Sequence, residues 1–503
     1  MRHGLIKQEV RELISWTSPV CISIMKGRSK MFNGPLRANP IKVIEEKDNL
    51  YLYIVETNGL FQIDDTVLEI CRSEGKKVEE IYELLNHRST KEDVDSLLTN
   101  LETASVIQFD DSSTNEVFHN YTDEKLSISS IILMLVQECN LRCSYCYGGD
   151  GEYNDKGRMD TETALRAVDY LFDQSGEEEE LNICFFGGEP LLNFKVIKEI
   201  VAYTKTKQKS SNKKVTYSMT TNGTLISKEI EIFLLDHHVS TQISLDGDRE
   251  THDYNRYFQN RKGTYDTILK KTKNLREKGG LTARATVSPV QLNITHTFTH
   301  LMEIGIHNVA MYPAVEMLNE EDFEKYASEF TKLVGYFESL IQAKQYRDAR
   351  QISNILKYLR MIHSSSTRHY FCGAVSHMLA VDVHGNLYPC QRFVKEKNYS
   401  LGNVKDGLNA KKKSDTLSEL RLEMRTTCAD CWAKNLCGGG CPQENLVFSG
   451  SINKPVDKYC NFIRSEIMDC LKLYLRLTEE DKRNLFPAKR QQKPILEDVS
   501  IGN

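Results

Sequence analysis

Short strand-like runs alternate with amphipathic stretches through the middle of the chain, and this alternation is its strongest structural pattern. The strand-like runs lie at residues 131–136, 181–186, 215–219, 241–245 and 282–288. Stretches with apolar residues at helical spacing lie between them, at residues 161–173, 194–206 and 228–236. Strands that alternate with helices in this way predict parallel βα units. We count about six units, which predicts an α/β fold with a partial (βα)6 TIM-type barrel.

The N-terminal part has a different order of elements. Short strands are predicted at residues 41–45, 50–56 and 60–63, with Asn58-Gly59 as a tight hairpin turn. Helices are predicted at residues 65–73, 77–85 and 90–103, and a further strand at 106–109. Thr90 followed by Asp93 is typical of a helix N-cap with an acidic first turn. Strands followed by three helices predict a winged helix-turn-helix domain.

These patterns divide the chain into six segments. We predict an N-terminal extension at 1–38, the winged helix at 39–112, the partial barrel at 125–316, a helical bridge at 317–368, a cysteine-rich domain at 369–475 and a C-terminal tail at 476–503.

Composition narrows the class of protein. A length of 503 residues suggests about three domains. No apolar run approaches the roughly 18 residues that span a membrane, and residues 1–13 lack a signal-peptide core. The net charge of −5 and the acidic residues of the winged helix argue against a nucleic-acid partner. We therefore expect a cytoplasmic protein with neither a membrane nor a nucleic acid as partner.

Cysteines are the most informative residues for chemistry. There are 14 of them, and most lie in spacings typical of metal sites, which favours a reducing compartment over disulfides. Cys139, Cys143 and Cys146 follow the first strand of the predicted barrel, at the end where active sites of βα folds lie. Iron–sulfur clusters are normally held by four cysteines, so three thiolates leave one iron open. A structural zinc knuckle is the alternative.

Seven further cysteines form a second pattern in the C-terminal part: Cys372, Cys390, Cys428, Cys431, Cys437, Cys441 and Cys460. Residues 382–390 between the first members read as a small hairpin that places a ligand on a strand. Asp382 lies beside these cysteines, although it is as readily a strand-end residue. One or two zinc sites are the alternative reading.

The first cysteine pattern resembles the CxxxCxYC signature of the radical S-adenosylmethionine (SAM) superfamily. Gly187-Gly188-Glu189-Pro190, after the second barrel strand, resembles the GGEP motif of that family. The resemblance implies that the open iron binds SAM, that the glycines allow close backbone approach, and that Glu189 binds the SAM ammonium group. It also implies SAM contacts from other positions near the strand ends: Tyr145, Pro190, Asn222, Ser244, Asp246 and Arg284. No other catalytic residue is predicted.

The second pattern resembles the SPASM domain, which binds auxiliary clusters in radical SAM enzymes that act on peptides and proteins. The resemblance implies three [4Fe-4S] clusters in all. Cys428, Cys431, Cys437 and Cys460 would ligate the distal auxiliary cluster, and Cys372, Cys390 and Cys441 the nearer one. Residues 373–389 contain no cysteine, so the nearer cluster would keep an open iron for a substrate thiolate.

Four cysteines remain outside these patterns. Cys71, Cys184 and Cys470 are predicted to be small buried apolar residues. Cys21 has no predicted place. One of the four could close the nearer cluster instead of a substrate thiolate.

Placed ahead of a radical SAM core, the winged helix resembles the RiPP recognition element, which binds the leader of a ribosomally made precursor peptide. In that family the leader adds as a strand to the sheet edge. The groove would lie between a strand near residues 52–55 and the third helix. A purely structural role is the alternative.

Together these features resemble peptide thioether synthases, the sactipeptide and ranthipeptide maturases. The resemblance implies that a 5′-deoxyadenosyl radical takes hydrogen from a carbon of the acceptor residue, and that a peptide cysteine then forms a thioether there. Expected partners are a cysteine-containing precursor peptide and a low-potential electron donor such as flavodoxin or ferredoxin. Alternatives are carbon–carbon crosslinking, epimerisation, formylglycine formation, or a non-catalytic peptide-binding or redox-sensing protein. The acceptor residue, the number of crosslinks and the oligomeric state do not follow from the sequence.

Overall fold

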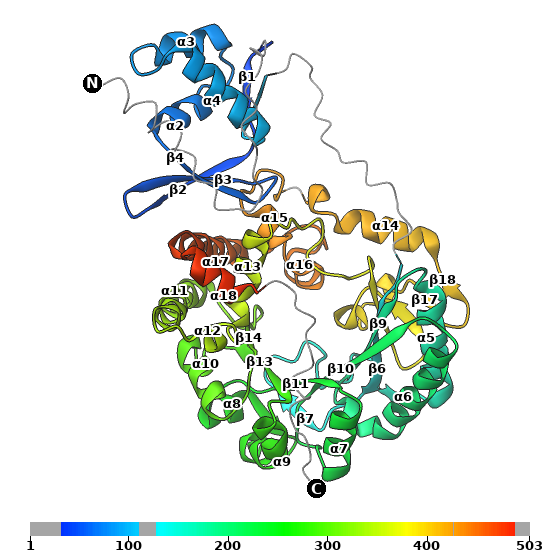
Figure 1. Cartoon of the computed structure of the whole chain (residues 1–503). Coiled ribbons are helices and arrows are strands. Elements are labelled where there is room, and N and C mark those ends of the chain that lie inside the picture. The colour runs from blue at the N-terminus through cyan, green and yellow to red at the C-terminus, as the bar shows by residue number, and fades with distance from the viewer. Residues whose placement is uncertain (1–31, 110–126, 426, 488–503) are drawn as a thin grey trace.

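A computed structural model of the chain describes residues 32–109, 127–425 and 427–487 (Figure 1). Cys21 and most of the predicted N-terminal extension lie outside the described residues, as does the end of the predicted tail.

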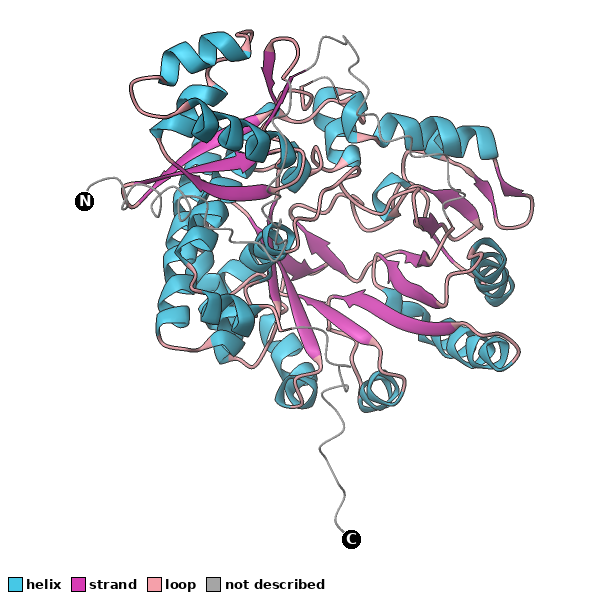
Figure 2. Ribbon diagram, turned by 45° about the horizontal axis from the view of Figure 1, so that its top comes forward, coloured by secondary structure: helices cyan, strands magenta, loops and turns pink. Residues whose placement is uncertain are grey.

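Six parallel strands form the centre of the molecule. In spatial order along one curved sheet they are β14 (Val309–Pro313), β13 (Leu281–Val287), β11 (Ser240–Ser244), β10 (Lys214–Thr221), β9 (Glu180–Gly187) and β6 (Ser130–Gln137). Helices cover the outer face of this sheet (Figures 1 and 2): α5 (Thr161–Gln174), α6 (Phe194–Lys209), α7 (Lys228–Asp236), α8 (Arg249–Asn255), α9 (Tyr265–Glu277), α10 (Ile294–Glu303) and α11 (Glu320–Gln342). The predicted strands and helices of this region are therefore present, with ends that shift by a few residues.

Alternate side chains of these strands point to the helices and to the concave inner face. On β13, Ala283 and Ala285 are buried, whereas Arg284 between them is exposed. On β9, Cys184 belongs to the less buried set, and its thiol lies within hydrogen-bond reach of Ser218. Cys184 therefore packs against the main core as a partly buried residue, whereas the sequence predicts a buried one.

The sheet continues beyond the six strands into the cysteine-rich part of the chain. Strand β15 (Met378–Val381) pairs in parallel with β6. Antiparallel strands follow it in order: β16 (Asn386–Tyr388), β17 (Gly402–Asn403) and β18 (Gly407–Leu408). The predicted hairpin is confirmed, and Asp382 shapes its turn by accepting hydrogen bonds from the backbone of His384 and Asn386.

The N-terminal part has its own apolar core. A three-stranded antiparallel sheet is followed by three helices and a separate pair of strands: β2 (Ile41–Glu46), β3 (Asn49–Ile54), β4 (Gly59–Ile63), α2 (Asp65–Cys71), α3 (Val78–Leu85), α4 (Lys91–Thr103) and β5 (Ile107–Phe109), which pairs with β1 (Leu36–Ala38). Thr90 caps α4 by accepting the amide of Asp93 at 3.3 Å. The order of strands and helices agrees with the predicted order.

One local prediction for this part is wrong. The tight turn is Lys47-Asp48, where both residues have positive φ, and it joins β2 to β3. Residues 55–58 form a longer loop between β3 and β4, with Asn58 in the left-handed region. Strand β3, which contains residues 52–54, is central and pairs with β2 and β4, so it offers no edge to an added strand.

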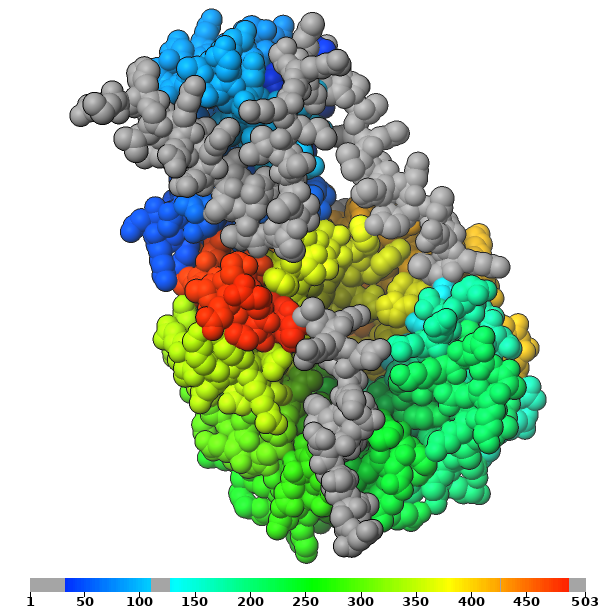
Figure 3. All heavy atoms as spheres, viewed as in Figure 1, coloured from blue at the N-terminus to red at the C-terminus, as the bar shows by residue number. Residues whose placement is uncertain are grey.

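The C-terminal helices pack beside the barrel. They are α12 (Tyr346–Ala349), α13 (Ser353–His363), α14 (Ala410–Leu420), α15 (Lys434–Cys437), α16 (Pro442–Ser449), α17 (Asp457–Arg476) and α18 (Glu479–Leu485). Helix α17 packs along α11, where Tyr326 stacks on Phe462 with ring centroids 4.6 Å apart. Figure 3 shows the C-terminal residues of the described chain, in red, between the N-terminal domain, in blue, and the barrel, in green. Within the described ranges, no helix is long and apolar enough to cross a membrane.

Candidate active site and cluster sites

The first cysteine loop lies at the C-terminal end of β6. Its short strand β7 (Leu141–Cys143) pairs with β12 (Arg256–Phe258), which fixes the loop against the opposite side of the barrel. Burial, followed by the neighbouring Glu189 and the two other thiols, raises the pKa of Cys139 to about 12. The structure thus brings Cys139, Cys143 and Cys146 together, and the set fits a cluster that binds them as thiolates.

The GGEP segment packs directly on this loop. The amide of Gly188 donates to Val136 O at 2.7 Å, and that of Glu189 donates to Glu138 O at 3.0 Å. A Cβ atom on Gly188 would lie 2.2 Å from the carbonyl oxygen of Glu138. Only glycine permits this approach, so the segment lies beside the cysteine loop because of its sequence.

Glu189 is a fully buried carboxylate. It accepts hydrogen bonds from Thr221 Oγ1 and the Asn222 amide, both at 2.8 Å, and from the Leu191 amide at 3.1 Å. Burial raises its pKa to about 7, although these hydrogen bonds lower it, and no cationic side chain contributes within the described part of the chain. A buried carboxylate without a counter-cation next to Cys139 fits an ammonium ligand.

Asn222 and Pro190 lie next to Glu189 and the cysteine loop. The Asn222 side chain donates to Asn140 Oδ1 at 2.9 Å and lies 3.9 Å from Cys139 Sγ. Pro190 begins a short 3-10 helix directly after Glu189. The end of β10 therefore contacts the cysteine loop through Asn222.

Asp246 connects the loop to the next strands. It is buried and accepts hydrogen bonds from Tyr145 Oη, from Arg256 Nε at 3.0 Å and from the Thr286 amide at 2.9 Å. Both carboxylate oxygens of Asp246 therefore accept hydrogen bonds from other residues of the chain. Arg256 also reaches Cys143 Sγ at 3.8 Å. Arg256 could not be identified from the sequence, because a single basic residue on a short strand carries no distinctive spacing.

Ser244 and Arg284 are neighbours on adjacent strands, since they pair in the register of β11 and β13. The Arg284 guanidinium lies 4.4 Å from the ring centroid of Tyr312 on β14. Its exposed position on the inner face leaves it accessible to a ligand in the barrel.

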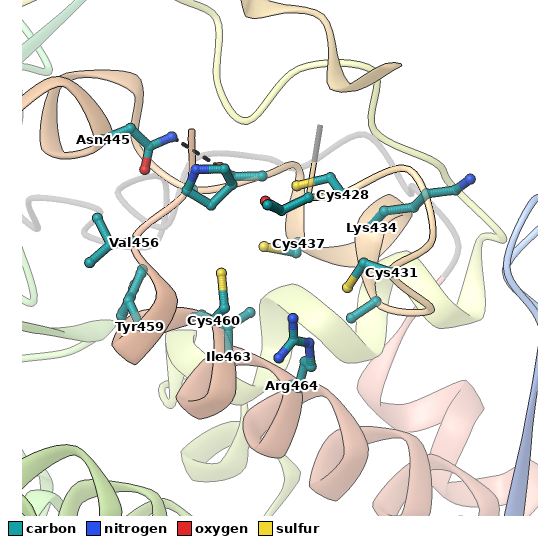
Figure 4. Close-up of a pocket in the computed structure, with 15 residues that line it drawn as sticks. Cys428, Cys431, Lys434, Cys437, Asn445, Val456, Tyr459, Cys460, Ile463 and Arg464 are labelled. Carbon is teal, nitrogen blue, oxygen red and sulfur yellow. Dashed lines mark hydrogen bonds between the residues drawn. The ribbon is translucent and has the colours of Figure 1, made fainter. Parts of the chain in front are cut away.

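The predicted ligands of the distal cluster line one cavity, shown in Figure 4. They are Cys428, Cys431, Cys437 on α15 and Cys460 on α17. Burial and then Cys437 raise the pKa of Cys428 to about 11 and that of Cys460 to about 12. The sulfurs surround a space, whereas nowhere among the described residues do three Cys, His, Asp or Glu side chains gather closely enough for a single metal ion. This arrangement fits a multi-iron cluster.

The predicted ligands of the nearer cluster, Cys372, Cys390 and Cys441, lie together at a second site. Burial raises the pKa of Cys390 to about 12, and the Cys441 and Cys372 thiols add to the shift. Cys71 lies in the separate N-terminal core and Cys470 is buried on α17 near Glu466. The three-ligand set is therefore consistent with a cluster that has one open iron.

Arg392 lies between this second site and the first cysteine loop and contacts both. Its Nη1 lies 3.7 Å from Cys441 Sγ, and its guanidinium lies 4.5 Å from the ring centroid of Tyr147, next to Cys146. It also forms an ion pair with Glu444 on α16. Arg392 is not among the residues predicted from the sequence, although its position two residues after Cys390 is a signal that it lies near the cluster.

Comparison with known proteins agrees with this arrangement. Residues 134–295 match the model of the radical SAM superfamily, and residues 372–432 match the SPASM iron–sulfur cluster-binding domain. The chain combines a radical SAM domain with a SPASM domain. SAM and iron–sulfur clusters are thus its cofactors.

Curated relatives that align with most of the chain are distant. The chain is 24% identical to a cysteine-type anaerobic sulfatase-maturating enzyme of Clostridium novyi, over 63% of this chain and 88% of the relative. It is 23% identical to the radical SAM cyclopropyl synthase TigE of Paramaledivibacter caminithermalis, over 89% of this chain and 96% of the relative. A solved structure of anSMEcpe with bound AdoMet matches with a TM-score of 0.60 at 20% identity, and the match covers 71% of this chain and 98% of the other. This chain and anSMEcpe therefore have the same overall fold.

Proposed function

We propose that this protein is a maturase of a ribosomally made precursor peptide and forms thioether crosslinks between a peptide cysteine and a carbon of an acceptor residue. The observation that carries the proposal is the three-cysteine site of Cys372, Cys390 and Cys441, where a substrate thiolate would be the fourth ligand. The similarity to a sulfatase-maturating enzyme and to TigE supports radical SAM chemistry on a peptide.

When bound, the clusters supply the electron that cleaves SAM to methionine and a 5′-deoxyadenosyl radical, and accept the electron left after the C–S bond forms. The chain's own residues position SAM. Glu189 would bind its ammonium group, and Arg284 and Ser244 would face its carboxylate. Gly187 and Gly188 would let the backbone of this segment approach the cysteine loop beside the methionyl part. Asp246 holds Tyr145 and Arg256, so its role is to keep the cysteine loop in position.

Arg392 acts on the peptide cysteine. A cation 3.7 Å from Cys441 Sγ favours negatively charged sulfur at the nearer site. It therefore helps a peptide thiol bind there as a thiolate, while the contact with Tyr147 keeps that site next to the SAM loop.

The leader of the peptide docks on the N-terminal domain, at a cavity between β4 and α4. Leu52 of β3 and Leu101 of α4 both line this cavity, which supports the predicted groove between a strand near residues 52–55 and the third helix. The walls are mainly apolar: Leu52, Phe61, Ile63, Val67, Leu101, Ala104 and Val106. Apolar side chains of an extended or helical leader would fill this cavity.

The test uses the anaerobically reconstituted full chain with SAM, a reductant and a cysteine-rich precursor peptide encoded beside its gene. Mass spectrometry should find two hydrogens lost per crosslink, with the affected cysteines no longer alkylatable. Loss of two hydrogens with every thiol still free would instead indicate carbon–carbon crosslinking. Absence of 5′-deoxyadenosine would favour a sensor or chaperone over an enzyme.

Formylglycine formation is the second candidate, and the match to the sulfatase-maturating enzyme favours it. In that reaction the cysteine sulfur is replaced by a carbonyl oxygen, so the peptide loses its sulfur. A sulfatase-derived cysteine peptide in the same assay separates the two candidates.

A further inference from the structure

Arg425 is among the largest fully buried side chains of the molecule. It follows a short 3-10 turn, Leu422–Met424, and precedes Cys428. Its Nη1 donates to the carbonyls of Gly439 and Gly440, the second at 3.2 Å. Its Nε and Nη2 are buried and have no hydrogen-bond partner in the described part of the chain. Two donors of a buried guanidinium are thus left without a partner among the described residues.

The glycines that hold Arg425 lie between two cysteines assigned to different clusters. Gly438, Gly439 and Gly440 all have positive φ and connect Cys437 to Cys441. A Cβ on Gly439 would lie 2.4 Å from Arg425 Cδ, so only glycine leaves room for the side chain. The chain therefore passes from the distal site to the nearer site around the Arg425 side chain.

The charges near Arg425 come from both sites. Burial lowers its pKa, while thiols of the distal pair Cys428 and Cys437 and of the nearer pair Cys372 and Cys441 raise it. A buried cation without counter-charge is strongly unfavourable. Thiolate-ligated clusters on both sides would provide that counter-charge, because ligand cysteines are deprotonated.

We infer that Arg425 is a cationic partner shared by the two auxiliary clusters, and that its unpaired N–H groups donate toward their sulfurs. Hydrogen bonds to cluster sulfurs and nearby charge set the reduction potential. A positive charge favours the more negative, reduced form of each cluster, so Arg425 raises both potentials. The inference rests on the two auxiliary clusters of the proposed function. It makes Arg425 a positioning and electrostatic residue, without contact to the substrate.

The test is a redox titration followed by electron paramagnetic resonance on the anaerobically reconstituted full chain. Cys139, Cys143 and Cys146 are replaced by alanine in every sample, so that only auxiliary clusters contribute. Signals are assigned with the added substitutions Cys372→Ala for the nearer cluster and Cys428→Ala for the distal one. Arg425→Met removes the charge at similar length, and Arg425→Lys retains it. Arg464→Gln is the matched control, because Arg464 hydrogen-bonds Cys431 of the distal set alone.

We expect Arg425→Met to lower the reduced-to-oxidised ratio of both clusters at least tenfold at fixed potential, which corresponds to about 59 mV for a one-electron couple. Arg425→Lys should lie between it and the parent, and Arg464→Gln should change the distal cluster alone. Unchanged ratios in a fully loaded Arg425→Met protein would overturn the inference.

Iron analysis tests the inference if a variant does not bind its auxiliary clusters. Loss of both clusters in Arg425→Met with retention in Arg425→Lys supports the shared charge. Loss in both variants assigns Arg425 a packing role and overturns it. A parent protein that binds iron for one auxiliary cluster would instead contradict the proposed cofactor set, whatever the variants do.

Discussion

The side-chain amide of Asn435 donates a 2.6 Å hydrogen bond to the backbone carbonyl of Val55. Val55 begins the loop after β3 of the N-terminal domain, and Asn435 lies on α15, two residues before the distal ligand Cys437. Lys434 adds an ion pair to Glu56 at 3.0 Å. The proposed leader-binding domain is therefore held against the distal cluster site.

Asn435→Ala should loosen this contact. The buried carbonyl of Val55 would lose its side-chain donor, at a cost of about 1–3 kcal/mol. Hydrogen–deuterium exchange should become faster in residues 52–58, and the thermal midpoint should fall. Asn260→Ala is the control, because Asn260 accepts a hydrogen bond in an exposed turn. Unchanged exchange at 52–58 would show that other contacts hold the domain.

SAM binding should depend on pH through Glu189. Burial raises its pKa to about 7, so the carboxylate is charged above that pH and neutral below it. Affinity for SAM should rise between pH 6 and 8, and Glu189→Gln should weaken binding at least tenfold at pH 8 and remove that rise. Equilibrium dialysis of the reconstituted protein measures both. Binding by the variant equal to that of the parent would exclude Glu189 as the ammonium partner.

The same shift affects stability in the absence of SAM. Because the folded pKa of about 7 exceeds the ordinary value of 4.5, the folded state binds the proton more tightly. Stability should therefore fall as pH rises from about 4.5 to 7, by about 3 kcal/mol if the whole shift is realised. Denaturant unfolding of the protein and of Glu189→Gln checks this, and the variant should show a smaller decline.

Gly188→Ala should prevent loading of the SAM cluster. The new Cβ would lie 2.2 Å from Glu138 O, and the cysteine loop would have to move. Iron analysis should show the loss of about four irons, with the auxiliary clusters retained. Gly335→Ala on α11 is the control, since open space surrounds it. That helix substitution should be neutral or stabilise by about 1 kcal/mol.

Replacing Arg392 should uncouple SAM cleavage from crosslinking. Its cation lies beside Cys441, on the nearer site, and pairs with Glu444. Arg392→Gln combined with Glu444→Gln removes the ion pair without leaving a lone charge. We expect the ratio of 5′-deoxyadenosine to crosslinked peptide to rise at least tenfold, measured by mass spectrometry. A proportional fall in both products would place Arg392 in SAM binding instead.

Filling the cavity of the N-terminal domain should weaken binding of the precursor. Ala104 lines this cavity at the end of α4, so Ala104→Trp would occupy it. We expect at least a tenfold loss of affinity for the full precursor in calorimetry, while a core peptide without its leader reacts as before. Ala343→Trp, on the exposed end of α11, is the control. Equal affinity would mean that the leader docks elsewhere.

Much of the site was predictable from local spacing. The cysteine loop, the GGEP segment and the strand ends are each short patterns, and parallel strands bring such ends to one edge. The structure accordingly places Asn222 and Glu189 beside Cys139. Asp246 and Tyr145 could each be assigned to the site from the sequence. Their hydrogen bond could not be predicted, because it joins segments about a hundred residues apart.

The sequence by itself determined the alternation of strands and helices and the two cysteine patterns, since residue spacing sets both. The tertiary structure decided how distant segments meet. It joined β15 to β6, made β3 a central strand, turned Cys184 to the inner face and placed Arg425 on the glycines between Cys437 and Cys441. These relationships depend on packing and on the balance of buried charge between segments far apart in the chain, for which no local pattern exists.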